Sequence, residues 1–147
     1  VHWKPGYVLM HAGGKPGQMQ DHPVYRDVVD EELAFFTKQM DRLVRAGLPE
    51  ERIVIDLGIG FGKTLFHNLT LLKAAQRFLS LGRPLLIGLS MKSLFYQLLG
   101  LELNQRALPT QVASALLFSR GVFWHRVHHV AETRTSLLLT QAMQTEL

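Results

Sequence analysis

The 147-residue chain contains no cysteine. Disulfide frameworks, thiolate nucleophiles and zinc sites built on cysteine are therefore excluded, and the absence is in keeping with a cytoplasmic location. No apolar run is long enough to span a bilayer, and the first residues lack the apolar segment of a signal peptide, so we expect neither feature. Charged residues make up 19% and hydrophobic residues 47% of the chain, which is typical of a globular domain rather than a disordered one.

Positive charge is in modest excess over negative charge. The formal net charge is +4 and the isoelectric point is about 9.7. The basic residues are scattered, however, without the basic stripe and interleaved aromatic residues that bind nucleic acid. We therefore expect neither a nucleic-acid nor a membrane partner, and a small anionic ligand suits the charge better.

Four short apolar runs alternate with segments of helical periodicity. The runs predict strands at residues 7–10, 52–56, 84–88 and 122–127. Helical segments are predicted at 24–46, 90–99 and 131–143. Two more helices are expected: one is capped by Asn68 and ends at Gly82, and the other has Pro109 in its first turn. Residues 11–22 are rich in glycine and proline and predict a loop.

This alternation predicts an α/β fold with a parallel sheet and right-handed crossovers. Two architectures compete: a small doubly wound sheet, or part of a (β/α)8 barrel. Complete barrels need roughly 250 residues, so the chain is long enough for about half of one. In either case we expect a single domain over residues 1–147.

Polar side chains follow the predicted strands at the ends where parallel α/β proteins bind ligands. The second strand ends at Asp56, and the glycine-rich loop from Gly58 to Lys63 would wrap the same site. The fourth strand would place Arg126 and His128 on one face, because alternate residues of a strand point the same way. Together with His11, Ser90 and Lys92 after the first and third strands, these side chains are expected to converge on one rim.

Each of these residues also has an ordinary structural interpretation. Asp56 could cap the turn that follows it, Lys92 could be solvated, and Arg126 could pair with Glu132. The spacing of His125, His128 and His129 matches no standard zinc site. The glycine loop has neither the phosphate-loop nor the dinucleotide-binding spacing.

Three motifs, taken together, closely resemble dihydropteroate synthase. They are Asp-Leu-Gly-Ile-Gly-Phe-Gly-Lys at 56–63, Gly-Leu-Ser-Met-Lys-Ser at 88–93 and Arg-Val-His-His-Val-Ala-Glu-Thr at 126–133. Leu-Met-His at 9–11, followed by a Gly/Pro loop, resembles the same family, and the motifs occur in the family's order and spacing. The resemblance implies four consecutive βα units equivalent to the C-terminal half of a (β/α)8 TIM barrel of the pterin-binding type.

The resemblance also implies a reaction and a set of roles. In folate biosynthesis the family's complete barrel, a transferase, condenses 6-hydroxymethyl-7,8-dihydropterin pyrophosphate with 4-aminobenzoate and releases pyrophosphate. The implied pterin-binding residues are Asp56, Phe61 and Lys92; the implied aminobenzoate-binding residues are Ser90 and Ser93; and the implied pyrophosphate-binding residues are Arg126 and His128. Lys92, Arg126 and His128 would be the catalytic residues. No metal ligand is expected in this chain, although Mg2+ is expected for the complete family enzyme.

Several positions depart from the family pattern around the ligands. Leu57 stands in place of proline, Met91 in place of an arginine that packs over the pterin, and His129 in place of aspartate. The family's N-terminal motifs are also missing, so a lone half barrel would expose sheet edges and apolar surface. We therefore expect a complementary N-terminal half or a homo-oligomer. Two alternatives stay open: a degenerate, non-catalytic half barrel that self-associates, and a pterin-binding domain like those of methyltetrahydrofolate-corrinoid methyltransferases.

Overall fold

The computed structural model of the chain describes residues 5–14 and 23–144. Its strands are β1 (Tyr7–Met10), β2 (Ile53–Asp56), β3 (Leu85–Ile87) and β4 (Trp124–His125). Its α-helices are α1 (Val28–Arg45), α2 (Leu65–Lys73), α3 (Ala75–Phe78), α4 (Leu94–Leu99), α5 (Ala107–Phe118) and α6 (Val130–Gln144). Single 3-10 turns are η1 (Glu50–Arg52), η2 (Leu79–Leu81) and η3 (Leu103–Gln105). The predicted alternation of strands and helices is confirmed.

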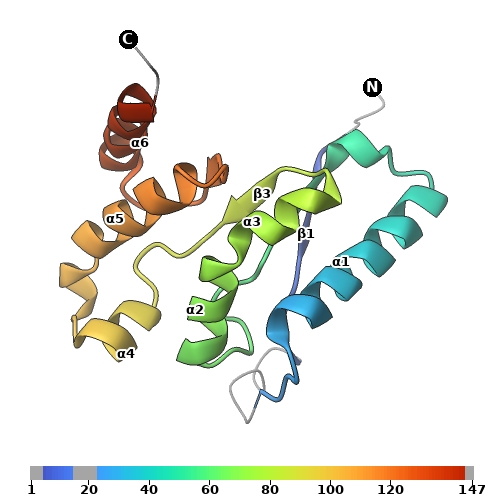
Figure 1. The fold of residues 1–147 in the computed structure, drawn as a ribbon, viewed down its shortest axis with the longest axis horizontal. Helices are drawn as coiled ribbons and strands as arrows, with labels where there is room; N and C mark the ends of the chain where they lie inside the picture. Colours follow the sequence, from blue (N-terminus) through green and yellow to red (C-terminus); the bar gives the residue numbers. More distant parts are fainter. Residues whose placement is uncertain (1–4, 15–22, 145–147) are drawn as a thin grey trace.

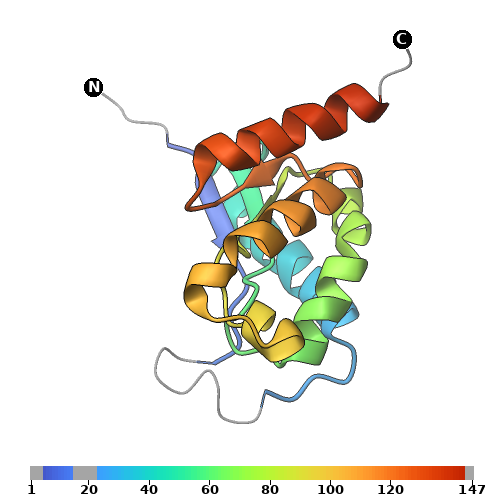
Figure 2. The same ribbon diagram turned by 90° about the vertical axis from the view of Figure 1, so that its left-hand side faces the viewer.

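The strands form one parallel sheet in the order β1-β2-β3-β4. A doubly wound sheet reverses its strand order at one point, whereas neighbouring strands of a (β/α)8 barrel follow each other in the chain. The helices gather along one face of the sheet, with α1 and α6 at opposite ends of the row (Figures 1 and 2). The described part of the chain is therefore an open half barrel, and the doubly wound alternative is wrong.

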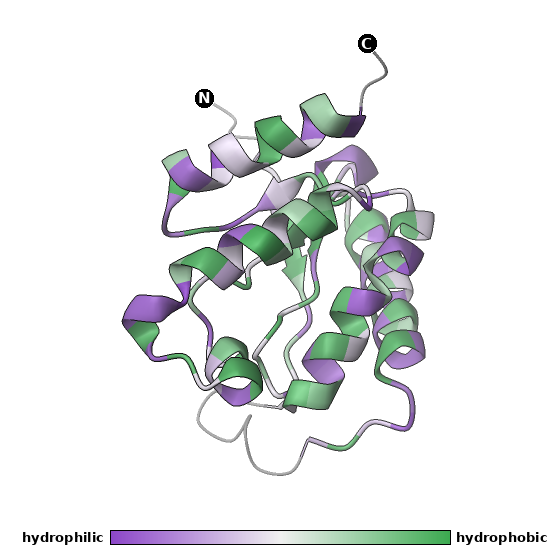
Figure 3. Cartoon of the chain, turned by 60° about the vertical axis from the view of Figure 1, so that its left-hand side comes forward, coloured by the Kyte–Doolittle hydropathy of each residue, from purple (hydrophilic) through white to green (hydrophobic). Residues whose placement is uncertain are grey.

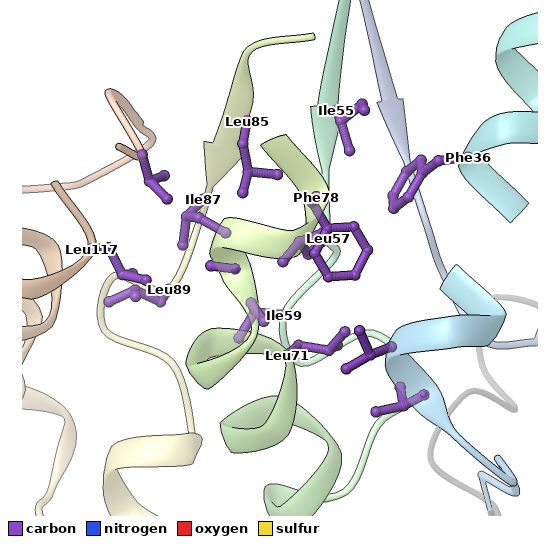
Figure 4. Packing of buried hydrophobic residues seen from close by; sticks show 14 of the residues in the cluster. Phe36, Ile55, Leu57, Ile59, Leu71, Phe78, Leu85, Ile87, Leu89 and Leu117 are labelled. Carbon is purple, nitrogen blue, oxygen red and sulfur yellow. The ribbon is translucent and has the colours of Figure 1, made fainter. Parts of the chain in front are cut away.

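The hydrophobic core lies between the sheet and the helices. Figure 4 shows Phe36 of α1 and Phe78 of α3 close to Ile55 and Leu57 of the second βα unit, and all four are fully buried. The rings of Phe36 and Phe78 meet edge to face with their centroids 6.0 Å apart. This layer supports the strand that carries Asp56.

The opposite face of the sheet is poorly covered within the described residues. The pairing register puts Met10, Asp56, Leu86 and Trp124 in one row across the four strands. Trp124 is 51% exposed. Val8, which precedes Met10 by two residues and lies on the same face of β1, is 50% exposed. In a closed barrel this face would be the packed interior.

Apolar side chains are also exposed on the last two helices, where green and purple segments are mixed along α5 and α6 (Figure 3). Leu108 is 73% exposed on α5, and Leu139 is 62% exposed on α6. Exposed apolar area of this extent is typical of surfaces that contact other protein. No helix in the described ranges is long and apolar enough to cross a membrane.

Three helix starts differ from the sequence prediction, since α4 begins at Leu94 and not at residue 90. Helix α1 begins at Val28, not near residue 24, because the Asp27 carboxylate accepts hydrogen bonds from the amides of Val29 and Asp30 at 2.9 and 3.0 Å. Helix α2 is capped by Thr64, whose hydroxyl accepts from the amide of His67 at 3.2 Å. The assignment of this cap to Asn68 was therefore wrong.

The fourth strand is shorter than predicted. It ends at His125, and Val122, which was predicted to open it, is a fully buried residue that precedes it. The amide of Arg126 still donates to the carbonyl of Ile87 at 3.0 Å. Arg126 and His128 therefore follow the strand instead of lying within it, although both remain at its carboxyl end.

Candidate functional site

The site begins at Asp56, which is only 2% exposed at the end of β2. Its Oδ1 atom accepts a hydrogen bond of 2.8 Å from the amide of Gly58, so the carboxylate does cap the turn that follows it. Gly58 has a φ of 61°, and a β-carbon there would lie 1.8 Å from the carbonyl oxygen of His11. Only glycine fits between the two loops at this position.

Arg126 reaches Asp56 from the far end of the sheet. Its Nη2 atom lies 3.3 Å from Asp56 Oδ2, and its side chain is 60% exposed. The guanidinium crosses the end of β3 at Gly88, where a β-carbon would lie 2.8 Å from Nη2. A glycine at this position therefore lets a cation from the segment after β4 meet a carboxylate on β2.

Ser90 and His128 form a second contact between neighbouring strand ends. Ser90 is 5% exposed, and its Oγ atom lies 3.0 Å from His128 Nδ1. The same hydroxyl oxygen accepts a hydrogen bond of 3.2 Å from the backbone amide of His128. The exposed imidazole is thus held at the rim by a buried hydroxyl.

Lys92 lies between the glycine loop and the rim. Its ammonium donates to the carbonyl of Ile59 and lies 4.4 Å from the centre of the Phe61 ring, within reach of a cation–π interaction. Burial lowers the pKa of Lys92 to about 8; the Asp56 carboxylate opposes this shift, whereas Arg126 and Lys63 add to it. The amine is therefore charged at neutral pH but less strongly basic than an exposed lysine.

These side chains surround one open pocket of about 290 Å3. Its lining residues are Phe61, Gly88, Ser90, Lys92, Arg126, Val127 and His128. Asp56 lies beside the pocket through its contact with Arg126. The predicted convergence of carboxylate, hydroxyl, ammonium, guanidinium and imidazole groups is therefore present, but Ser93 is exposed at the start of α4 and does not line the pocket.

The backbone beside Lys92 is strained. Met91 has a φ of 59°, and it is the one non-glycine residue with positive φ within the described ranges. Its carbonyl accepts from Arg106 Nη1 at 3.1 Å, and its amide donates to Thr110 Oγ1 at 3.2 Å. Sequence reasoning missed both supporting residues, because each lies on or before α5 and carries no motif.

His125 does not belong to the rim. It faces a second pocket between β4 and helices α5 and α6, so it lies on the helix side of the sheet. Its Nε2 atom donates to the carbonyl of Val122 at 2.8 Å, and burial lowers its pKa although this bond acts in the opposite direction. His125 and His128 therefore point into different pockets.

The donors of the rim do not fit a metal ion. Residues 5–14 and 23–144 contain no group of three His, Asp or Glu side chains placed to hold one. The two oxygens of Asp56 already contact the amide of Gly58 and the guanidinium of Arg126. The expectation of Mg2+ concerns the complete family enzyme and stays a prediction.

The main feature that sequence reasoning missed lies behind the glycine loop. His11 and Lys63 do not line the rim pocket but meet the buried carboxylate of Glu32. A signal was available, since Val29, Glu32, Leu33 and Phe36 follow helical spacing and so place an acid on the apolar face of α1.

Comparisons with known proteins agree with this geometry. A family model described as "Pterin binding enzyme" matches residues 2–128. Dihydropteroate synthase of Haemophilus influenzae is 37% identical over 134 residues, which are 91% of this chain and 49% of that protein. The structure of dihydropteroate synthase from Stenotrophomonas maltophilia with active site-bound imidazole has a TM-score of 0.92 at 40% identity, over 97% of this chain and 54% of that one. The protein named inactive dihydropteroate synthase 2 of Mycobacterium tuberculosis is 35% identical over 144 residues, 95% of this chain and 45% of that protein.

The fold and the rim together define an α/β domain equivalent to half of a (β/α)8 barrel, with its polar groups at the carboxyl ends of the strands. The chain spans about half the length of the curated relatives it matches. It belongs to the family of pterin binding enzymes.

Proposed function

We propose that the chain carries one half of a dihydropteroate synthase site. The reaction would join 6-hydroxymethyl-7,8-dihydropterin pyrophosphate to 4-aminobenzoate and release pyrophosphate. The observation that carries this proposal is the meeting of Asp56, Lys92 and Arg126 at one rim, where two cations line one pocket and a buried acid lies beside it. A ligand with a donor-rich heterocycle at one end and a pyrophosphate at the other matches these charges.

The pterin would bind at the Asp56 side of the pocket. One edge of a pterin presents a 2-amino group and a ring N–H, and a single carboxylate can accept hydrogen bonds from both. Phe61 would pack against the ring system, and Lys92 would donate to the pterin carbonyl. Since Asp56 Oδ2 faces Arg126 at 3.3 Å, binding of the pterin edge would replace this contact and leave the guanidinium for the pyrophosphate.

The pyrophosphate would bind to Arg126 and His128, and the aminobenzoate would lie near Ser90 and Ser93. In the reaction, the amine nitrogen of 4-aminobenzoate forms a bond to the methylene carbon of the pterin, and the bond from this carbon to the pyrophosphate oxygen breaks. The electron pair leaves with the pyrophosphate, and one amine proton is lost. Arg126 and His128 would lower the barrier because they neutralise charge that grows on the leaving group. Positioning of the two substrates supplies the remaining effect.

The half site needs completion. Val8 and Trp124 are about half exposed on the sheet face that would form the interior of a closed barrel. This exposure favours a complementary half that covers them. A second copy of the chain is the other candidate for this role. We place the assembled protein in the cytoplasm.

A second candidate function is pterin binding without catalysis. The relative named inactive dihydropteroate synthase 2 is 35% identical over 95% of this chain, so the family includes members described as inactive. Met91, His129 and Leu57 stand at positions where this chain departs from the family motifs. In this case the rim would retain ligand affinity but release no pyrophosphate.

The test is complementation in solution. The chain is mixed with the half of the Haemophilus influenzae relative that it does not match, and release of pyrophosphate from the two substrates is measured. Asp56→Asn is the matched variant, because an amide oxygen still accepts the Gly58 amide while the negative charge is lost. We expect pyrophosphate release by the mixture and a loss of pterin affinity of at least about tenfold in the variant. Binding without turnover supports the non-catalytic alternative, and equal binding by both proteins removes Asp56 from the site.

A further inference from the structure

Three ionisable side chains meet behind the glycine loop, outside the pocket. Glu32 Oε1 lies 3.0 Å from His11 Nδ1 and 3.1 Å from Lys63 Nζ. The side chains of Glu32 and Lys63 are fully buried, and that of His11 is 12% exposed. None of the three lines the proposed substrate pocket.

The ammonium of Lys63 also meets backbone carbonyls of two different loops. It donates to Gly58 at 3.1 Å and to Phe61 at 3.4 Å, both in the glycine loop. It lies 3.5 Å from the carbonyl of His11, in the loop after β1. A single cation therefore connects both loops to the carboxylate of Glu32 on α1.

The two loops are packed so closely that small displacements of one would move the other. The amide of His11 donates to the carbonyl of Asp56 at 3.1 Å, and the amide of Gly13 donates to Phe61 at 3.2 Å. A β-carbon on Gly62 would lie 2.1 Å from the carbonyl of Gly13. The conformation of the glycine loop is thus set by what holds it against the β1 loop.

A buried ion pair is a poor way to gain stability, because desolvation of both charges offsets much of their attraction. Burial lowers the pKa of Lys63, against the influence of Glu32 and Asp56. A pair that contributes little net stability can still select one loop conformation, since the ammonium must find several oxygens at once. Two of the carbonyls that it finds belong to Gly58 and Phe61, which would flank the pterin side of the pocket.

We infer that Lys63 and Glu32 form a positioning pair that holds the glycine loop in its ligand-binding conformation. This inference rests on the proposed function, since Phe61 and the Gly58 turn matter through the pterin that they would contact or support. Lys63 does not line the pocket and would touch no substrate. It acts through the carbonyls of Gly58 and Phe61, to which its ammonium donates in the glycine loop.

The pair is tested with Lys63→Met, which keeps the length of the side chain and removes the charge. Since this variant leaves Glu32 buried without its cation, the double variant Lys63→Met with Glu32→Gln is prepared beside it. We expect both to bind 6-hydroxymethylpterin at least tenfold more weakly than the parent. Affinity for pyrophosphate should stay within twofold, because Arg126 and His128 are carried by the segment after β4, away from the glycine loop.

Amide NMR resonances of the glycines give a ligand-free measurement on the same proteins. Those of Gly58 and Gly62 should shift or broaden in both variants, whereas those of Gly82 and Gly100, which lie at remote helix ends, should stay in place. Unchanged loop resonances, or equal losses of pterin and pyrophosphate affinity, would overturn the inference. If the parent itself binds no pterin, the proposed function fails, and the resonances alone decide whether Lys63 holds the loop.

Discussion

Gly88→Ala is a direct test of how Arg126 is placed. Gly88 lies at the end of β3 without positive φ, so alanine fits its backbone conformation. The added β-carbon would lie 2.8 Å from Arg126 Nη2 and 3.1 Å from Nε. Ordinary contact begins at 3.4 Å, so the guanidinium must retreat by roughly 0.6 Å or turn away. The substitution therefore moves one cation and leaves the rest of the rim in place.

The expected effects on stability and on binding differ. Alanine reduces the entropy of the unfolded chain, which stabilises the fold by about 0.4–1 kcal/mol. Loss of the half-exposed contact between Arg126 and Asp56 costs roughly 0–1 kcal/mol, so the net change in stability is close to zero. A charge-assisted hydrogen bond to an anion contributes about 1.5–3 kcal/mol, so pyrophosphate affinity should fall roughly 10- to 150-fold.

Calorimetric titration with pyrophosphate measures this loss. Gly6→Ala is the matched control, because its β-carbon would meet only the carbonyl of Arg52 at an ordinary 3.6 Å. The same substitution is also made in an Arg126→Ala background. If Gly88→Ala acts through Arg126, it should have no further effect there. Parent affinity in Gly88→Ala, or an equal additional loss in the Arg126→Ala background, refutes the reasoning.

Two other predictions concern Met91, whose backbone is strained, and Lys92, which is partly buried, in the segment after β3. Met91→Gly should stabilise the fold by about 0.5–1 kcal/mol, because the relief of the positive φ outweighs the entropy that glycine adds to the unfolded chain. Urea unfolding should show this gain for Met91→Gly but not for Met91→Ala. The pKa of Lys92 is about 8 in the folded state, below the value of 10.5 in the unfolded state. Between these two pH values the unfolded state binds more protons, so the free energy of unfolding rises with pH in this window. Urea unfolding at pH 7 and pH 10 should therefore show a larger gain for the parent than for Lys92→Met, and an equal gain in both would contradict the burial of a charged Lys92.

Much of the rim could be predicted from the sequence because parallel strands place their carboxyl ends together. Asp56 and Ser90 each follow an apolar run, and the order of the runs brings them to one edge of the sheet. Phe61 of the glycine loop and Lys92 of the second motif line the same pocket, as expected of two segments assigned to one site. The ligands and roles assigned to these residues stay predictions.

The remaining features depend on tertiary contacts that local patterns do not reveal. Arg126 pairs with Asp56 across 70 positions of sequence, and the pairing depends on the absence of a side chain at Gly88. Thr64 caps α2 with His67 in the position where a capping box usually has Glu or Gln, so the usual signature was absent. Asn68 instead accepts the amide of Gly60 at 2.8 Å, a contact with the glycine loop that no helix pattern contains.

The order of the strands has a consequence for how the site is assembled during synthesis. Within residues 5–14 and 23–144 each strand pairs only with strands next to it in the chain, so β1, β2 and β3 can associate as soon as each has left the ribosome. The segment that carries Arg126 and His128 is made after these three strands. The two groups that would bind the pyrophosphate are therefore added to a sheet on which Asp56 is already in place.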